Sequence, residues 1–221
     1  MSGDAFRDTW LSLRQRLLAR GLMASDSDSL SLRDPESGQM GWGTAADTSM
    51  QKLPIQSGAS GGSETLETSE TAAITLHRTV YEARLDVCAV LIGGGPFGRQ
   101  MLSFGGWMPP VFDEQIRQLG RMASPTDRLS RLPDALADGG NVAMHAGQLL
   151  LLGMTPSRLA LNAELFEKCA KAWVPAAASG AKLRTLPWIV RHVANGRLMK
   201  EEARAREQVR RGLKPDETRG Y

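Results

Sequence analysis

The order of apolar runs and turn residues over positions 141–172 constrains the fold more than any other part of this 221-residue chain. Apolar runs at residues 142–144 and 148–152 flank the turn-like sequence His145-Ala146-Gly147. Thr155 can cap a helix that has Pro156 at its first position. Apolar residues then recur at helical spacing: Leu159, Ala163, Phe166, Ala170 and Trp173. The segment predicts a tight strand–strand corner carrying a histidine, followed directly by a long amphipathic helix.

The rest of the chain is expected to alternate between helices and strands. Apolar periodicity and capping residues predict helices over residues 4–21, 64–84, 100–104, 113–122, 185–193 and 199–211. Residues 29–33, 39–42 and 86–92 are typical of strands, the last buried on both faces. Residues 56–63 are expected to form a mobile Gly/Ser loop. Because several strands are joined by hairpins, we expect an α/β fold, an α/β/α sandwich rather than a strictly parallel sheet.

Length and composition indicate a main domain over residues 1–196 and a charged helix and tail over residues 197–221. A net charge of +3 with interspersed signs does not favour a nucleic-acid partner. No apolar run approaches the roughly 20 residues that span a bilayer, and the N-terminus is polar. We therefore expect a cytoplasmic protein without a membrane partner. Cys88 and Cys169 lack partners at metal spacing and are expected to be reduced core residues.

Three segments upstream of His145 carry further motifs. The first is the Ser31-Leu32-Arg33 strand after an N-terminal helix, and the second contains Thr44. The third, residues 77–90, reads HRTVYEARLDVCAV. Together these segments resemble the class II aldolase/adducin family over roughly residues 5–174, since that family carries His-x-x-x-Tyr-x-x-Arg-x-Asp-Val-x-Ala-Val at the third position. The resemblance implies a mostly antiparallel central sheet with helices on both faces, and a homotetramer with active sites between subunits.

The chain departs from the family pattern where the family places its chemistry. Asp28-Ser29 stands in place of Gly-Asn, and residues 92–96 replace His-x-His-Pro with Ile-Gly-Gly-Gly-Pro. The family's Asn-His-Gly corner is Met144-His145-Ala146 here, so only the histidine matches. In the family, three histidines hold a divalent metal, usually zinc, which stabilises an enediolate, and a glutamate is the general base or acid. A single imidazole does not hold zinc usefully.

The preferred interpretation is therefore an aldolase-like protein that has lost the metal ligands and zinc-dependent aldol cleavage, and keeps a binding or structural role without a cofactor. The first alternative is an active, divergent sugar-phosphate lyase with zinc or another divalent metal. It would use Glu70 as base, because Thr68-Ser69-Glu70 imitates the family's Ser-Ser-Glu, although Glu70 lies seven residues before His77 instead of four. His145, His77 and Glu70 would then converge as a two-histidine, one-carboxylate site; packing of His77 near the sheet is the simpler reading.

The second alternative is an anion or nucleotide site at residues 93–98, which match G-x-G-x-x-G after a strand. Backbone amides at glycines let a phosphate approach closely, and nearby hydroxyls add donors. The residues expected to bind such a sugar phosphate are Ser29, Thr44, Ser69, Gly93 and Gly94. Trp107, Met108 and Val111 are expected to form an exposed apolar interface between copies of the chain.

Overall fold

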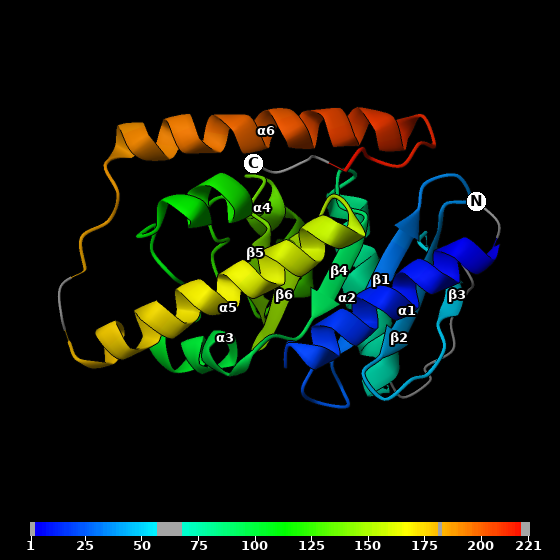
Figure 1. Ribbon diagram of the computed structural model, residues 1–221, viewed down its shortest axis with the longest axis horizontal. Coiled ribbons are helices and arrows are strands. Elements are labelled where there is room, and N and C mark those ends of the chain that lie inside the picture. The colour runs from blue at the N-terminus through cyan, green and yellow to red at the C-terminus, as the bar shows by residue number, and fades with distance from the viewer. Residues whose placement is uncertain (1–2, 57–67, 181–182, 218–221) are drawn as a thin grey trace.

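The computed structural model describes residues 3–56, 68–180 and 183–217. Within them, the centre is a six-stranded sheet in the order β3-β2-β1-β4-β6-β5, with every neighbouring pair antiparallel (Figure 1). The strands are β1 (Ser29–Asp34), β2 (Gln39–Thr44), β3 (Gln51–Pro54), β4 (Ala89–Ile92), β5 (Val142–His145) and β6 (Gln148–Gly153). The expected α/β fold with an antiparallel sheet is confirmed.

Helices of very different length surround this sheet. The α-helices in the described residues are α1 (Gly3–Ala19), α2 (Ser69–Ala83), α3 (Pro96–Gln100), α4 (Leu132–Leu136), α5 (Pro156–Ala178) and α6 (Trp188–Arg210). Short 3-10 turns are η1 (Met101–Phe104) and η3 (Leu129–Arg131), and η2 (Gln115–Leu119) is a turn of π-helix. The expected start of the second helix and most of the Gly/Ser loop, residues 57–67, lie outside the described residues.

The side chains of the central strands alternate between two apolar clusters, one on each face of the sheet. In β4, Ala89 and Leu91 belong to the cluster that contains side chains of α1 and α5. Val90 and Ile92 belong to the cluster that contains side chains of α2 and α4. All four are buried, which confirms the prediction of a strand covered on both faces. Successive residues of a strand point to opposite faces, so an apolar run is what such a strand requires.

The hairpin and helix predicted for residues 141–172 are confirmed. His145 pairs with Gln148 across the turn, in which Ala146 has a φ of 45° and Gly147 a φ of 78°. The Thr155 hydroxyl accepts a hydrogen bond from the Arg158 amide at 3.1 Å, so it caps α5 as expected. A two-residue turn with positive φ at both positions matches the twist of antiparallel strands and fixes their register.

Helix α6 corrects the expectation of two separate C-terminal helices at 185–193 and 199–211. It is continuous from Trp188 to Arg210, and so crosses the boundary expected at residue 197. Leu198, Glu202 and Ala205 are its buried residues. Helix α6 contacts the body through Glu202, which accepts a hydrogen bond from the buried Arg84 guanidinium at 3.1 Å.

Other expectations were also tested by the structure. The helix expected over 113–122 ends at Leu119 in π-helical form, and Met108 is buried instead of exposed. Cys88 and Cys169 are both free and buried, as predicted. Among the described residues, no helix is both long and apolar enough to cross a membrane.

Candidate functional site

Antiparallel pairing brings most of the candidate residues to one end of the sheet. Ser29 at the start of β1 lies opposite Thr44 at the end of β2 and opposite Ile92 at the end of β4. Ile92 in turn lies opposite Leu150 near the start of β6, whose partner strand β5 ends at His145. The end of the sheet defined by Ser29, Thr44, Gly93 and His145 is called the candidate edge below.

His77 of α2 lies beneath this edge as a closed hydrogen-bonding link between a helix and the sheet. Its Nε2 is 2.9 Å from the Ser29 hydroxyl, and its Nδ1 is 2.8 Å from the Ser31 hydroxyl. The Ser31 hydroxyl also contacts the Tyr81 hydroxyl at 2.8 Å. Complete burial lowers the pKa of His77 to about 3, because the charged imidazolium loses its water. With both ring nitrogens engaged, His77 is a neutral structural link.

His145 stands apart from that link. It is 8% exposed, and its buried Nδ1 has no hydrogen-bond partner among the described residues. Three strand spacings, about 14 Å, separate β5, which carries His145, from β1, to which His77 is hydrogen-bonded. The structure therefore does not bring His145 and His77 together.

Glu70 lies beside the outermost strand β3, on the other side of the sheet from the outermost strand β5, which carries His145. Its carboxylate accepts a hydrogen bond from the Gln51 side chain of β3 at 3.4 Å, and the residue is exposed. Strands β3 and β5 are the two outermost strands, so five strand spacings, about 24 Å, separate them. Ser69 is also exposed, at the first turn of α2. One chain thus does not assemble Glu70 and His145 into a common site.

The glycine loop after β4 is closed by a carboxylate of the same chain. The two oxygens of Glu167 in α5 accept hydrogen bonds from the backbone amides of Phe97 and Gly98, each at 2.9 Å. A Cβ at Gly95 would collide with this carboxylate, and one at Gly94 would collide with Leu149. The glycines make room for internal side chains, and Glu167 engages amides that an external anion would need.

Asp28 and Asp47 engage other donors at the candidate edge. Asp28 accepts hydrogen bonds from the backbone amides of Ala24 and Ser25 and forms an ion pair with Arg99. Asp47 accepts from both the amide and the hydroxyl of Thr44, at 2.7 and 2.9 Å. The amide of Gly93 donates to the carbonyl of Leu149. The predicted anion donors Thr44, Gly93 and, through His77, Ser29 are therefore all bonded within the chain.

The donor set at the candidate edge does not fit a divalent metal. Across the part of the chain that the structure describes, no group of three or more His, Cys, Asp or Glu side chains could hold a metal ion. The loop that follows β4 offers backbone amides and carbonyls only, and Glu167 is bonded to two of those amides. A catalytic zinc site needs three protein ligands and an open position, so a lone imidazole falls short.

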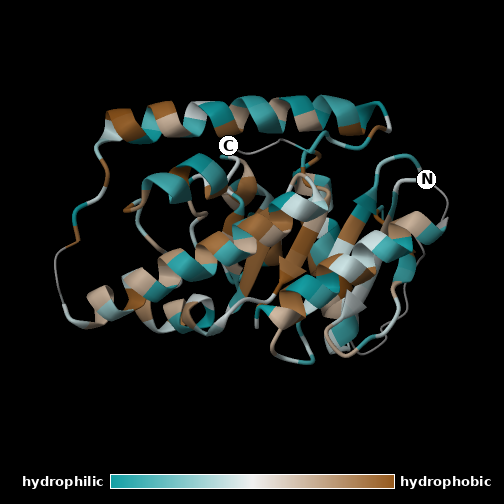
Figure 2. Cartoon of the chain, in the orientation of Figure 1, coloured by the Kyte–Doolittle hydropathy of each residue, from teal (hydrophilic) through white to brown (hydrophobic). Residues whose placement is uncertain are grey.

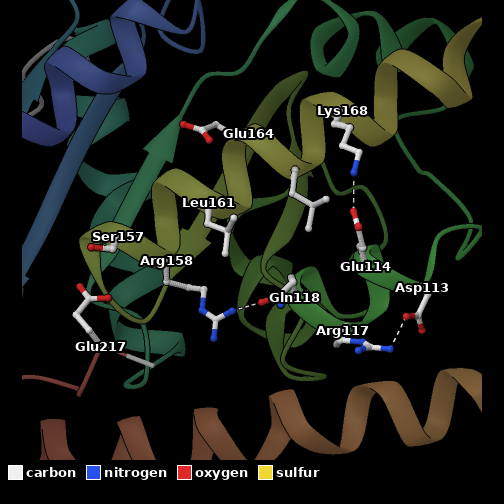
Figure 3. Close-up of a pocket in the computed structure, with 11 residues that line it drawn as sticks. Asp113, Glu114, Arg117, Gln118, Ser157, Arg158, Leu161, Glu164, Lys168 and Glu217 are labelled. Carbon is white, nitrogen blue, oxygen red and sulfur yellow. Dashed lines mark hydrogen bonds and ion pairs between the residues drawn. The ribbon is translucent and has the colours of Figure 1, made fainter. Parts of the chain in front are cut away.

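A cavity of about 710 Å³ lies elsewhere, between α5 and η2 (Figure 3). Its lining residues on α5 run from Ser157, near the start of the helix, to Lys168. Charged side chains that line it pair with one another: Arg117 with Asp113, and Lys168 with Glu114 (Figure 3). No residue predicted from the sequence as catalytic, metal-binding or anion-binding lines this cavity.

Sequence reasoning missed Asp28, Asp47, Arg99 and Glu167 as the residues that organise the candidate edge. Only Asp28 had a signal, since it replaces the glycine of the Gly-Asn pair in the resembled pattern. Glu167 lies 70 residues after Phe97, its hydrogen-bond partner, and nothing in the local pattern links the two. An acidic residue beside the apolar stripe of a helix is ordinarily a solvated one.

Comparison with solved structures confirms the class II aldolase fold. An L-fuculose 1-phosphate aldolase matches with a TM-score of 0.69 and 17% identity, over 90% of this chain and 98% of that one. YgbL, a candidate aldolase/epimerase/decarboxylase from Klebsiella pneumoniae, matches with a TM-score of 0.68 and 18% identity, over 88% and 99%. An aldolase II superfamily protein from Pseudomonas syringae matches with a TM-score of 0.66 and 16% identity, over 98% of both chains. No family model matches, and no curated protein sequence matches. At these identities the likeness establishes the fold.

Proposed function

We propose that the chain is a class II aldolase-fold protein that does not carry out metal-dependent aldol cleavage and instead has a binding or structural role. One observation carries the proposal: the candidate edge offers a single imidazole, His145, and a glycine loop whose amides are bonded to Glu167. A Lewis-acid mechanism needs several ligands around one ion. The residues at this edge make bonds that hold the fold together.

The experiment that tests this proposal measures metal content and cleavage on the same sample. The purified protein is dialysed against zinc or manganese, washed, and analysed for bound metal, and turnover of L-fuculose 1-phosphate is measured beside an active aldolase. We expect less than stoichiometric metal and no turnover. Stoichiometric metal that disappears in His145→Ala, together with turnover that depends on it, would refute the proposal.

A second candidate function is favoured by one observation, the unpartnered Nδ1 of the buried His145. A buried nitrogen without a partner carries a desolvation penalty that a ligand can relieve. In this reading His145 binds zinc or another divalent metal together with side chains of a neighbouring copy, and the protein is a divergent lyase with Glu70 as base. Turnover that is lost in Glu70→Gln but kept in the exposed control Glu82→Gln would establish it.

Finer points of architecture belong to the same proposal. We infer a three-layer α/β/α sandwich, because the two apolar clusters place α1 and α5 against one face of the sheet and α2 and α4 against the other. We also infer self-assembly, as a homotetramer in the family that the sequence resembles, and a cytoplasmic location. Light scattering of the purified protein tests the assembly: a monomer at all concentrations would contradict it.

A further inference from the structure

Most side chains in the first half of α6 are exposed to solvent. Every residue from 187 to 193 is exposed, and the first buried residue of α6 is Leu198. Figure 1 shows α6 lying along one long side of the molecule, and Figure 2 shows hydrophobic residues at its start. Cavities of about 480 and 390 Å³ adjoin residues of this half. The body therefore does not cover these side chains.

The uncovered side chains are large and apolar. Trp188 is 69% exposed, Ile189 56% and Val193 71%. Met199 on the same helix and Leu183 just before it are also exposed. Soluble proteins rarely expose contiguous apolar residues unless the patch binds something. The patch defined by Trp188, Ile189, Val193 and Met199 is called the α6 patch below.

The unpaired charge close to the α6 patch in the sequence is positive. Residues 183–200 contain no Asp or Glu and four exposed cationic residues: Arg184, Arg191, Arg197 and Lys200. Asp113 lines the cavity beside Ile189 and Val193, but it forms an ion pair with Arg117. Arg197 pairs with Glu201, the first acidic residue after the run. The α6 patch is thus an apolar surface with a cationic border.

We propose that the α6 patch docks the protein on the surface of an anionic lipid bilayer. A helix with Trp and aliphatic side chains on an uncovered face and Lys or Arg beside them is suited to the boundary between headgroups and acyl chains. Cationic residues attract the negative surface potential of such a membrane. Face-to-face pairing of two α6 patches is less favourable, because it would oppose two cationic borders. Surface docking needs no spanning segment, so it revises the expectation of no membrane partner.

The test is co-sedimentation of the full chain with vesicles. One set is phosphatidylcholine alone, and the other contains equal parts of phosphatidylcholine and phosphatidylserine. We expect the protein to pellet only with the anionic vesicles and to be released by salt, since screening weakens the attraction. Arg184→Gln and Lys200→Gln should each lower the partition constant about five-fold. The double variant Trp188→Ser, Ile189→Ser should abolish pelleting.

Leu161→Ser is the matched control, because it removes an exposed leucine from α5, outside the α6 patch. It should pellet like the unmodified chain. The proposal is overturned if the protein ignores anionic vesicles, or if Leu161→Ser and the double variant lose binding equally. It is also overturned if light scattering shows that the double variant breaks an oligomer into monomers, since a second copy then covers the α6 patch. These readouts do not depend on metal binding or aldol cleavage.

Discussion

Replacing Glu202 by Gln should make the protein's stability less dependent on pH. Glu202 is buried in α6 and contacts Arg84 and Asn141, while Asp86 is bonded to the same guanidinium at 2.6 Å. Burial raises the pKa of Glu202 from 4.5 to about 7, despite the opposing attraction of Arg84. The folded state therefore favours the protonated carboxyl, and folding is opposed once the side chain must ionise.

The sign and size of the expected change in stability follow from the linkage between proton binding and folding. The folded pKa lies above the unfolded pKa, so the folded state binds more protons between pH 4.5 and about 7. Stability from this group is present below pH 4.5 and is lost as pH rises through 7. The gap corresponds to roughly 3 kcal/mol. Glutamine resembles the protonated acid at every pH, so its stability relative to the unmodified chain should rise by that amount over the window.

The assay is denaturant unfolding of both proteins at several pH values across this window. The difference in unfolding free energy between Glu202→Gln and the unmodified chain should grow with pH. Their difference in melting temperature should grow by roughly 2–4 °C for each kcal/mol of that difference. Glu207→Gln on the same helix should give a much smaller difference, because the ion pairs of Glu207 with Arg210 and Arg211 are exposed to solvent. If the curves for Glu202→Gln and the unmodified chain run parallel, Glu202 is ionised in the folded protein and the reasoning fails.

Three further substitutions test the packing around the sheet, and a fourth, in α6, is a control. His77→Gln should flatten the loss of stability as pH falls from 6.5 towards 3, a loss of roughly 5 kcal/mol caused by the neutral buried imidazole, measured by denaturant unfolding. Glu167→Ala should speed hydrogen exchange at residues 97–98, because two amides lose their acceptor, as mass spectrometry would show. Gly153→Ala should lower the melting temperature, since its Cβ collides with the backbone of Leu159, whereas Gly196→Ala, with open space around it, should raise stability by about 1 kcal/mol.

The elements predicted correctly are those whose signals are local. Thr155 and Pro156 define the start of α5 by chemistry confined to one helical turn, and the structure has both in those roles. The corner at His145 is likewise encoded by two short runs and a glycine. The single helix α6 was predicted as two, because Gly196 and a change from apolar to charged residues mark a local break. Its contact with the body depends on Glu202 meeting Arg84, 118 positions earlier in the chain.

The sequence predicted where the candidate edge lies in the fold, but not which hydrogen bonds its residues make. The motifs place Ser29, Thr44 and His145 at the ends of strands. Because the strands pair in antiparallel register, these strand ends meet at one end of the sheet. The bonds they make there come from side chains far away in sequence, such as the one between His77 and Ser29. Burial decides the role of His77 by holding its pKa low, and burial follows from packing that no local motif records.

Carboxylates of the same chain explain why the glycine loop should be a poor anion site, even though it matches a phosphate-binding pattern. An external phosphate would have to displace Glu167 from the amides of Phe97 and Gly98. A group fixed on the same chain competes at a high effective concentration, and a displaced, partly buried carboxylate would lose its hydrogen bonds. Asp47 opposes binding at Thr44 in the same way. The glycine spacing thus allows an anionic group to approach the backbone amides closely, and in this fold that group is the carboxylate of Glu167 from the same chain.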